Sequence, residues 1–245
     1  MKLIFIRHGD PCKDSFGLTE KGQIQSSLLG GFFNGKIIKG IFVSPSKRAQ
    51  ETLKFFLNYY SLNNKITFIK DIQWLNEFKY EITLPDGSKQ FPWEIPLDYW
   101  CSSTDMLDLS TCMDNDIYIS GDIKERMQLI WGELDRFLSN VGYTRRGNYY
   151  HSNCSNRDCY VFISHFATIS IILGHLLNIP PNTMLHHFWQ GPSGVTTLQS
   201  EEVDFGKVLF RCIGYNETVH LPSLNANFKS LYGLKQEVFN QKENN

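Results

Sequence analysis

Short, almost continuous apolar runs recur along the chain, and stretches with apolar residues every three or four positions separate them. The runs have the length and composition of strands buried on both faces of a sheet. They occupy four places, at residues 3–6, 40–43, 66–69 and 160–163. Two further strands are expected late in the chain, at residues 194–198 and 208–211.

The first helical stretch follows the first apolar run after a polar loop. Thr19 is a suitable N-cap, and Ile24, Leu28 and Phe32 repeat every four residues to form the expected buried stripe. Gly35 is suited to the end of the helix, because glycine tolerates the left-handed conformation found there.

The second helix is expected directly after the strand at 40–43. Ser44 can cap it and Pro45 suits its first position. The expected buried positions of this helix are Ala49, Leu53 and Phe56. Helical spacing returns in two further places, at residues 127–137 and at residues 166–178.

Strands that alternate with helices predict an α/β fold, here a three-layer α/β/α sandwich with a mostly parallel central sheet. No repeat or linker divides the sequence, so residues 1–245 are expected to form a single domain. The periodicity fades between residues 79 and 121, where proline, aspartate and aromatic residues are frequent, which indicates an inserted, lid-like segment. Residues 145–158 are polar and expected to be an exposed loop, and residues 236–245 a loose terminus.

Composition places the chain among globular proteins and narrows the partners. Of the 245 residues, 42% are hydrophobic and 20% are charged. A chain of this length and composition can bury a hydrophobic core, which excludes disorder as its main state. A net charge of −1 gives no broad electrostatic footprint for nucleic acid, and no stretch is long and apolar enough for a membrane span. The six scattered cysteines lack a C-x-x-C pair, so free thiols and a cytoplasmic location are expected. The sequence leaves the oligomeric state open, a homodimer included.

Cationic and imidazole side chains follow three of the predicted strands. Arg7 and His8 end the first, Arg48 lies just beyond the second, and His165 follows the run at 160–163. The carboxyl ends of parallel strands share one edge of a sheet, where helix N-termini also present N–H donors. A guanidinium can donate two parallel hydrogen bonds to a pair of phosphate oxygens. This pattern therefore predicts a site for a phosphoryl dianion.

The same residues carry a family resemblance. Arg7-His8-Gly9 after an N-terminal strand, the turn Leu18-Thr19-Glu20-Lys21-Gly22, the motif Ser44-Pro45-x-x-Arg48-Ala49-x-x-Thr52 and the late Ser164-His165 resemble the histidine phosphatase superfamily. That family includes cofactor-dependent phosphoglycerate mutases and many phosphomonoesterases. The order and spacing of the motifs fit over residues 3 to about 198.

The resemblance implies a role for each matching residue. His8 would be the nucleophile and form a phosphohistidine, while Arg7, Arg48 and His165 would hold the phosphoryl oxygens. The family's general acid usually follows the third strand in a Leu-x-Glu context, which makes Glu77 the candidate here. No metal and no other cofactor is implied.

Phosphoryl chemistry requires a distinct protonation state of each group. His8 must be neutral to attack, and His165 beside a dianion is expected to be protonated. Glu77 must hold a proton for the leaving alkoxide, and desolvation together with the nearby anion would raise its pKa.

Three positions depart from the family pattern near the expected phosphate. Asp10 stands where Glu or Gln is usual and can still accept hydrogen bonds, but Pro11 replaces the usual Thr or Ser. Phe166 stands where small residues are common, so its ring narrows the pocket while its backbone N–H stays available to phosphate. We therefore add Asp10 and Phe166 to the expected substrate-binding residues.

Other candidate groups favour structural roles. The spacing of His151, Cys154 and Cys159 matches no common zinc motif. His186-His187 is expected in a loop, where a structural or exposed pair is favoured over substrate contact. The aromatic residues of the insert are expected to pack it onto the sheet rather than to stack on substrate.

The sequence thus predicts a metal-independent phosphomonoesterase that hydrolyses a small phosphorylated metabolite through a phosphohistidine. Two alternatives stay open, a phosphoglycerate mutase-type phosphoryl transfer and a catalytically inactive module that binds a phosphorylated ligand. The short, proline-bearing first loop argues against the mutase, and the presence of His8, Arg48 and His165 argues against the inactive module.

Overall fold

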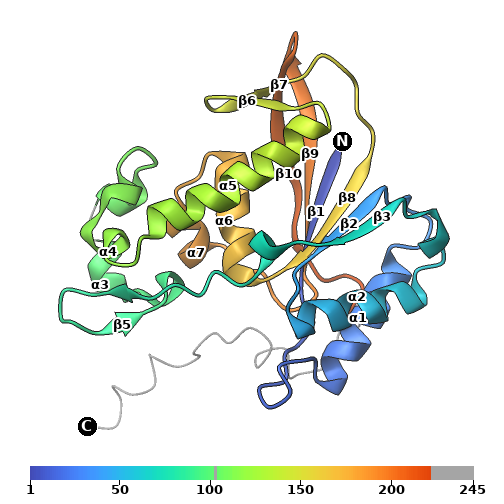
Figure 1. The fold of residues 1–245 in the computed structure, drawn as a ribbon, viewed down its shortest axis with the longest axis horizontal. Helices are drawn as coiled ribbons and strands as arrows, with labels where there is room; N and C mark the ends of the chain where they lie inside the picture. Colours follow the sequence, from blue (N-terminus) through green and yellow to red (C-terminus); the bar gives the residue numbers. More distant parts are fainter. Residues whose placement is uncertain (102–103, 222–245) are drawn as a thin grey trace.

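The computed structural model of the protein describes residues 1–101 and 104–221. In this part of the chain, eight strands form one sheet in the order β3-β2-β8-β1-β9-β10-β7-β6, as Figure 1 shows. Their bounds are β1 Lys2–Arg7, β2 Gly40–Val43, β3 Phe68–Asp71, β6 Thr144–Arg146, β7 Tyr149–His151, β8 Cys159–Ser164, β9 Val195–Asp204 and β10 Lys207–Glu217. A small hairpin apart from this sheet pairs β4 (Ile82–Thr83) with β5 (Lys89–Gln90).

The four strands that the apolar runs predict lie next to one another in the sheet. β3, β2, β8 and β1 pair in parallel, as the sequence predicts for strands buried on both faces. β9, β10, β7 and β6 extend the sheet beyond β1 with antiparallel pairings. The predicted α/β class is confirmed, and the parallel block brings the carboxyl ends of β2, β8 and β1 side by side.

Helices cover both faces of the sheet. Their bounds are α1 Glu20–Phe32, α2 Lys47–Tyr59, α3 Leu97–Trp100, α4 Asp116–Ile119, α5 Ile123–Asn140, α6 Phe166–Leu177 and α7 Pro181–His187. Figure 1 shows α1 and α2 on one side and α5 and α6 on the other. Along β1, Leu3 and Phe5 join the core under α5 and α6, whereas Ile4 and Ile6 join the core under α1 and α2.

Helix α1 begins as predicted but buries a different face. The Thr19 side chain accepts a hydrogen bond from the backbone N–H of Gly22 at 3.0 Å, which confirms the N-cap. The predicted apolar stripe is wrong, since Ile24 is 58% exposed and the buried face carries Leu29 among small and polar residues instead. The reason is the close approach of α2: a Cβ added to Gly30 would lie 2.2 Å from the carbonyl oxygen of Phe56.

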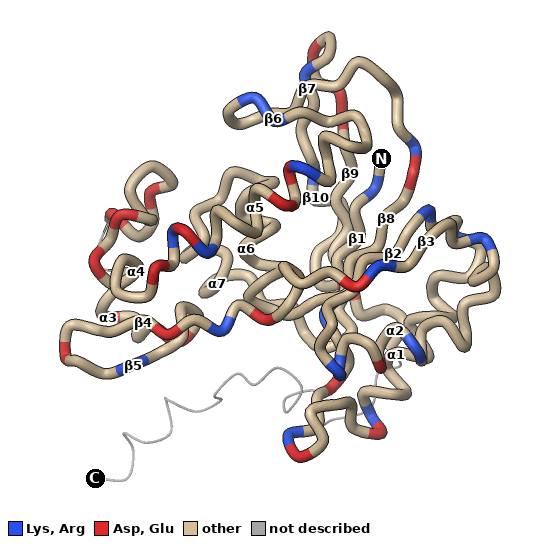
Figure 2. The backbone as a smooth tube through the Cα atoms, in the orientation of Figure 1, with Lys and Arg blue, Asp and Glu red and all other residues tan. Residues whose placement is uncertain are grey.

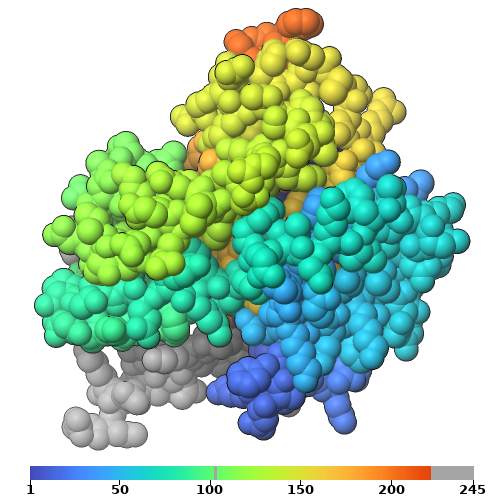
Figure 3. All heavy atoms as spheres, in the orientation of Figure 1, coloured from blue at the N-terminus to red at the C-terminus, as the bar shows by residue number. Residues whose placement is uncertain are grey.

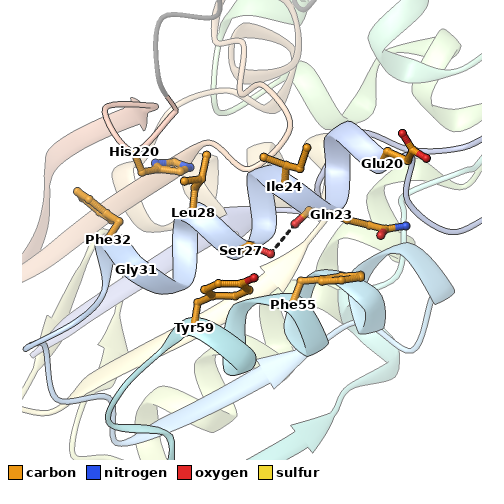
Figure 4. Close-up of a pocket in the computed structure, with 10 residues that line it drawn as sticks. All are labelled: Glu20, Gln23, Ile24, Ser27, Leu28, Gly31, Phe32, Phe55, Tyr59 and His220. Atoms are coloured by element: carbon orange, nitrogen blue, oxygen red, sulfur yellow. Dashed lines mark hydrogen bonds between the residues drawn. The ribbon is translucent and has the colours of Figure 1, made fainter.

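The predicted stripe instead lines a surface cavity of about 870 Å³. Figure 4 shows Ile24 and Leu28 of α1 on the side of His220, and Phe55 and Tyr59 of α2 on the opposite side of α1. No candidate site residue lines this cavity, so it is separate from the predicted phosphoryl site.

Helix α2 begins two residues later than predicted. Ser46 is the N-cap and Lys47 the first helical residue, so the assignment of Ser44 as cap and Pro45 as first residue is wrong. The Ser44 hydroxyl is used elsewhere, because it accepts from the backbone N–H of Ser46 at 3.2 Å and contacts an imidazole described below. The predicted buried positions are confirmed: Ala49, Leu53 and Phe56.

Two further segments differ from the expectation. The third strand covers Phe68–Asp71, two residues beyond the predicted range. Residues 145–158 are not simply an exposed loop, since β6 and β7 form a hairpin that joins the sheet through β10. The cause is Tyr150, which is 2% exposed and packs edge-on against Phe210 with ring centroids 5.2 Å apart.

The segment at 79–121 packs against the body of the protein. Its apolar side chains enter the same core as α5 and α6, among them Ile82, Met106, Ile117 and Tyr118. Figure 3 shows this segment, in teal to green, as one lobe of the molecular face in view. The segment is therefore held by the same core as α5 and α6, and its assignment as an insert stays a prediction.

The structure can be compared with the expectations for surface charge, cysteines and membrane-spanning segments. Lys and Arg alternate with Asp and Glu over the elements in Figure 2, in keeping with a net charge of −1. All six cysteines are free. Within the described residues no helix has the length and apolar character needed to cross a membrane. The terminus predicted at 236–245 lies outside the described residues.

Candidate active site

Three neighbouring parallel strands deliver the predicted site residues to one edge of the sheet. Arg7 is the last residue of β1, and His8 follows it. His165 directly follows β8 as the N-cap of α6, and Arg48 lies in the first turn of α2, beyond the end of β2. The structure brings His8, Arg48 and His165 into contact, and Glu77 joins them from the segment after β3. Arg7 lines the same cavity as Glu77.

His8 is buried and held in one tautomer. It is 2% exposed, its Nδ1 lies 2.8 Å from the Gly9 carbonyl oxygen, and its Nε2 lies 3.1 Å from Nε of Arg48. A guanidinium only donates, so Nε2 is the acceptor and Nδ1–H donates to Gly9. Burial lowers the pKa of His8 well below its usual value, and the charge of Arg7 adds to this effect. The ring is therefore neutral, with its lone pair on Nε2.

His165 receives the other arm of the same guanidinium. Arg48 donates from an Nη atom to Nδ1 of His165 at 2.9 Å, which leaves the ring proton on Nε2. That proton points to hydroxyl oxygens, Ser44 Oγ at 2.9 Å and Ser46 Oγ at 3.2 Å. Burial lowers the pKa of His165, and His8 and Arg48 lower it further. The two imidazoles lie edge to face with centroids 5.0 Å apart.

The carboxyl group of Glu77 lies close to the Arg48 guanidinium and to the His165 imidazole. Its Oε2 is 3.8 Å from Arg48 and 3.6 Å from Nδ1 of His165. Burial raises the pKa of Glu77, although the charges of Arg7 and Arg48 oppose the rise. The result is a carboxyl group that holds its proton to higher pH than an exposed glutamate does.

The segment that carries Glu77 is tied to the strand ends. Ser164 donates from its hydroxyl to the Leu75 carbonyl at 2.6 Å, and Thr168 donates to the Asn76 carbonyl at 2.5 Å. Ser44 donates to the Asn76 side chain at 2.9 Å. These hydrogen bonds fix the position of Glu77 relative to β8 and α6.

Arg7 faces a cavity beside this cluster. One Nη donates to the Gln190 carbonyl at 2.7 Å, and the guanidinium carbon lies 5.0 Å from the Trp189 ring. Burial lowers the pKa of Arg7 to about 10, so it keeps its charge at neutral pH. The cavity measures about 330 Å³, and its lining residues are Arg7, Glu77, Trp93, Phe166, Leu185, His186 and Trp189.

The two remaining predicted residues lie in different surroundings. Phe166, the first residue of α6, lines the cavity and packs on Trp189 with ring centroids 5.1 Å apart. Asp10 does not line the cavity, because its carboxylate accepts from the Thr19 hydroxyl at 2.8 Å, and its backbone N–H donates to Gln25. Asp10 therefore holds the entry of α1, and its contact with substrate stays a prediction.

Sequence reasoning missed several residues of this region. The sequence pattern predicts Ser44 as a helix cap, and it gives no signal for Ser46. His186 was expected in a loop and in a structural role, but it lies in α7 and lines the cavity. Trp189 was not singled out. Its position, two residues beyond α7, gives no sequence pattern that points to the site.

A metal ion suits this arrangement less well than an anion. Ligand atoms of His8, Glu77 and His165 lie within 4.8 Å of one another, which is close enough for shared coordination. However, Arg48 donates to the lone pairs on both imidazoles, and its charge repels a cation. Two guanidinium groups and the N-terminus of α6 favour an anion with several acceptor oxygens.

Comparisons with solved structures identify the fold. A mutant phosphoserine phosphatase of Entamoeba histolytica in complex with phosphoserine aligns with 20% identity, covering 90% of this chain and 99% of the other, with a TM-score of 0.55. A putative alpha-ribazole-5'-P phosphatase of Escherichia coli aligns with 18% identity, covering 89% and 98%, with a TM-score of 0.52. At such identities the likeness shows the fold. No curated protein matches the sequence.

A family comparison adds the N-terminal motifs. The model of the histidine phosphatase superfamily (branch 1) matches residues 3–73, which contain β1, α1, β2 and α2 with Arg7, His8 and Arg48. The fold extends the likeness over about nine-tenths of the chain, 90% in the first comparison. The predicted resemblance to the histidine phosphatase superfamily is thereby confirmed: residues 3–73 match the family model, and the fold of the chain is that of solved phosphatases.

Proposed function

We propose that this protein is a phosphomonoesterase that hydrolyses a small phosphorylated metabolite through a phosphohistidine at His8. The observation that carries the proposal is the state of the His8 ring. Its Nδ1–H is held by the Gly9 carbonyl, and its Nε2 lone pair faces Arg48, which shares its guanidinium with His165.

In the first step Nε2 of His8 attacks phosphorus and the bond to the leaving oxygen breaks. The phosphoryl oxygens offer Arg48 stronger acceptors than two imidazoles, so its N–H donors turn to them and release the Nε2 lone pair. Arg7 and Arg48 then balance the charge of the loose, anionic transition state. The Gly9 carbonyl stabilises Nδ1–H as the ring becomes positive.

Glu77 supplies the proton balance of both steps. Because its pKa is raised, it holds a proton that it can give to the leaving alkoxide. In the second step the resulting carboxylate takes a proton from water, whose oxygen attacks phosphorus. The bond between His8 and phosphorus then breaks, and phosphate leaves with His8 neutral again.

The names of the structural relatives support phosphate-ester chemistry, since those proteins are phosphatases. The arrangement of His8, Arg48 and His165 supports metal independence, because the guanidinium occupies the lone pairs that a metal would need.

The purified protein is therefore expected to hydrolyse p-nitrophenyl phosphate in excess chelator. His8→Ala should lose at least about a thousandfold in kcat. Thr83→Ala, in the hairpin of the insert, serves as a matched control and should keep full activity. A His8→Ala protein that retains most of its turnover would overturn the proposal.

A further inference from the structure

The cavity beside Arg7 carries more polar groups than the proposed chemistry uses. Four of its lining residues have a buried polar atom without a hydrogen-bond partner in the described part of the chain: Arg7 Nε, Glu77 Oε1, His186 Nε2 and Trp189 Nε1. Buried polar atoms nearly always have a partner. Arg7 and Glu77 are committed to the phosphoryl group and the proton, so His186 and Trp189 are available to a leaving group.

Trp189 contributes a hydrogen-bond donor. An indole N–H cannot accept, so its partner must be an acceptor oxygen or nitrogen. The ring is fixed between two neighbours, with the Arg7 guanidinium carbon 5.0 Å and the Phe166 ring 5.1 Å from its centroid. The direction of the N–H is therefore set before a ligand enters.

His186 contributes an acceptor. The ring is hydrogen-bonded to the backbone of Pro92, which has no N–H, so one ring nitrogen donates there. Burial lowers the pKa of His186 to about 4, so the ring is neutral and Nε2 carries a lone pair. Stacking on Trp100, with centroids 4.7 Å apart, holds the ring in place.

A charged leaving group fits these two partners poorly. A carboxylate oxygen at His186 would face the Nε2 lone pair. An ammonium group would lie in the positive field of Arg7 and Lys79, the same cations that lower the pKa of His165. A hydroxyl group both donates and accepts, so a pair of hydroxyls satisfies His186 and Trp189 without any charge.

The remaining walls and the size agree with such a group. Trp93, Phe166 and Leu185 offer apolar and aromatic surface, which suits the C–H face of a sugar or polyol. The volume of about 330 Å³ leaves room for a phosphoryl group with a small leaving group.

We propose that this cavity binds the leaving group of an uncharged polyol monophosphate, such as a sugar phosphate, with one hydroxyl donating to His186 and another accepting from Trp189. The inference rests on the proposed function and names its substrate class.

The test compares kcat/KM for sugar and glycerol phosphates with that for phosphoserine and 3-phosphoglycerate, with p-nitrophenyl phosphate as a reference that has no hydroxyl groups. Wild-type protein should prefer the best polyol phosphate to both charged esters by at least about tenfold, the value of one hydrogen bond. A protein that hydrolyses the reference but prefers phosphoserine or 3-phosphoglycerate overturns this inference and leaves the proposed function intact. A protein that hydrolyses none of them defeats the proposed function itself.

Two aromatic variants locate the selectivity. Trp189→Phe and His186→Phe keep an aromatic ring but remove one polar atom each. In either variant the ratio of kcat/KM for the polyol phosphate to that for the reference should fall about tenfold. Matched controls are Trp131→Phe, whose indole N–H donates to the Ile171 carbonyl in the core, and His187→Phe, which is exposed beside His186. An unchanged ratio in both cavity variants contradicts the assignment.

Discussion

Ser44 Oγ lies 2.9 Å from Nε2 of His165, on the side of the ring opposite Arg48. The hydroxyl comes from the end of β2 and the imidazole from the end of β8, strands that pair in parallel. Through this contact the neighbouring strand selects the tautomer of His165 that leaves Nδ1 free to accept from Arg48. A residue taken for a helix cap thus positions a candidate catalytic group.

Ser44→Ala is expected to lower kcat/KM about tenfold, because one hydrogen bond that orients His165 is lost while Ser46 still offers another at 3.2 Å. Steady-state kinetics measure the effect, and circular dichroism shows whether the fold is kept. Ser46→Ala, which removes the longer contact, should cost less. Equal activity of wild type and Ser44→Ala would show that the hydroxyl does not position His165.

Arg48→Lys is expected to lose about a hundredfold to a thousandfold in kcat/KM despite keeping the charge. An ammonium cannot donate to both imidazoles in the fixed geometry of a guanidinium, as Arg48 does at 3.1 and 2.9 Å. Lys54→Arg on the exposed side of the same helix is a suitable control. Near wild-type activity of Arg48→Lys would show that charge alone is sufficient.

Binding of phosphate is expected to take up protons at about pH 8, where free phosphate is already mostly the dianion and releases few protons of its own. Without an anion, burial and the nearby cations lower the pKa of His165, so it is neutral. A dianion favours the imidazolium and raises that pKa, which draws a proton from solution. Calorimetric titrations in buffers of different ionisation enthalpy measure this uptake. His165→Asn should abolish it, and binding without proton uptake by the wild type would be incompatible with a protonated His165.

Glu77→Gln is expected to separate the two steps. With p-nitrophenyl phosphate the leaving group needs no proton, so phosphorylation of His8 continues, while the amide cannot take a proton from water in the second step. A rapid burst of p-nitrophenol followed by a slow phase is the expected record in stopped-flow absorbance. For an alkyl phosphate, whose leaving group needs the proton, wild-type kcat should fall as pH rises through the raised pKa of Glu77, where the acid is lost. Linear progress curves of Glu77→Gln at the wild-type rate would exclude the assigned role.

Gly30→Ala is expected to destabilise the protein by about 1–3 kcal/mol, since the new methyl group would lie 2.2 Å from the Phe56 carbonyl oxygen. Gly31→Ala is the matched control, because nothing lies within 4 Å of its added Cβ. It should stabilise by about 0.5–1 kcal/mol through helix propensity. Urea unfolding gives both values, and equal effects at the two positions would contradict the close packing of α1 on α2.

Asp135→Asn is expected to destabilise the protein by about 1–3 kcal/mol at neutral pH. Burial acts to raise the pKa of Asp135, but hydrogen bonds with His175 at 3.0 Å and Tyr150 at 2.7 Å outweigh it and lower the pKa. A lowered pKa means that the carboxylate stabilises the fold above its unfolded pKa and loses this effect as pH falls through the folded value. The difference between wild type and variant should therefore shrink toward acid pH. A difference that stays constant with pH would show that the charge is not involved.

The sequence was informative where burial and backbone chemistry act locally. The apolar runs of β1, β2 and β8 identify the parallel block, and Thr19 marks the start of α1. The sequence was misleading where packing between helices and strands determines which residues are buried. The Ile24 stripe is exposed because small residues allow α2 to approach, and Tyr150 turns a polar segment into a hairpin.

The candidate site also contains residues that the sequence predicts and residues that it does not. Arg7, His8, Arg48 and His165 each end or follow a strand, so the shared edge of a parallel sheet was enough to predict their meeting. His186 and Trp189 reach the cavity through the tertiary path of α7 and the segment after it, which no local pattern encodes. The leaving-group side of the cavity therefore needed the structure.

The central claim is a phosphoryl group carried by Nε2 of His8. The most direct measurement is the mass of the protein and of its peptides after Glu77→Gln has been mixed with substrate and stopped at alkaline pH, where phosphohistidine survives. One added phosphoryl group on the peptide that contains His8, absent from the His8→Ala, Glu77→Gln double variant, is the predicted result. Hydrolysis that proceeds with no phosphoryl group on the protein, or with one on a different residue, would contradict the account.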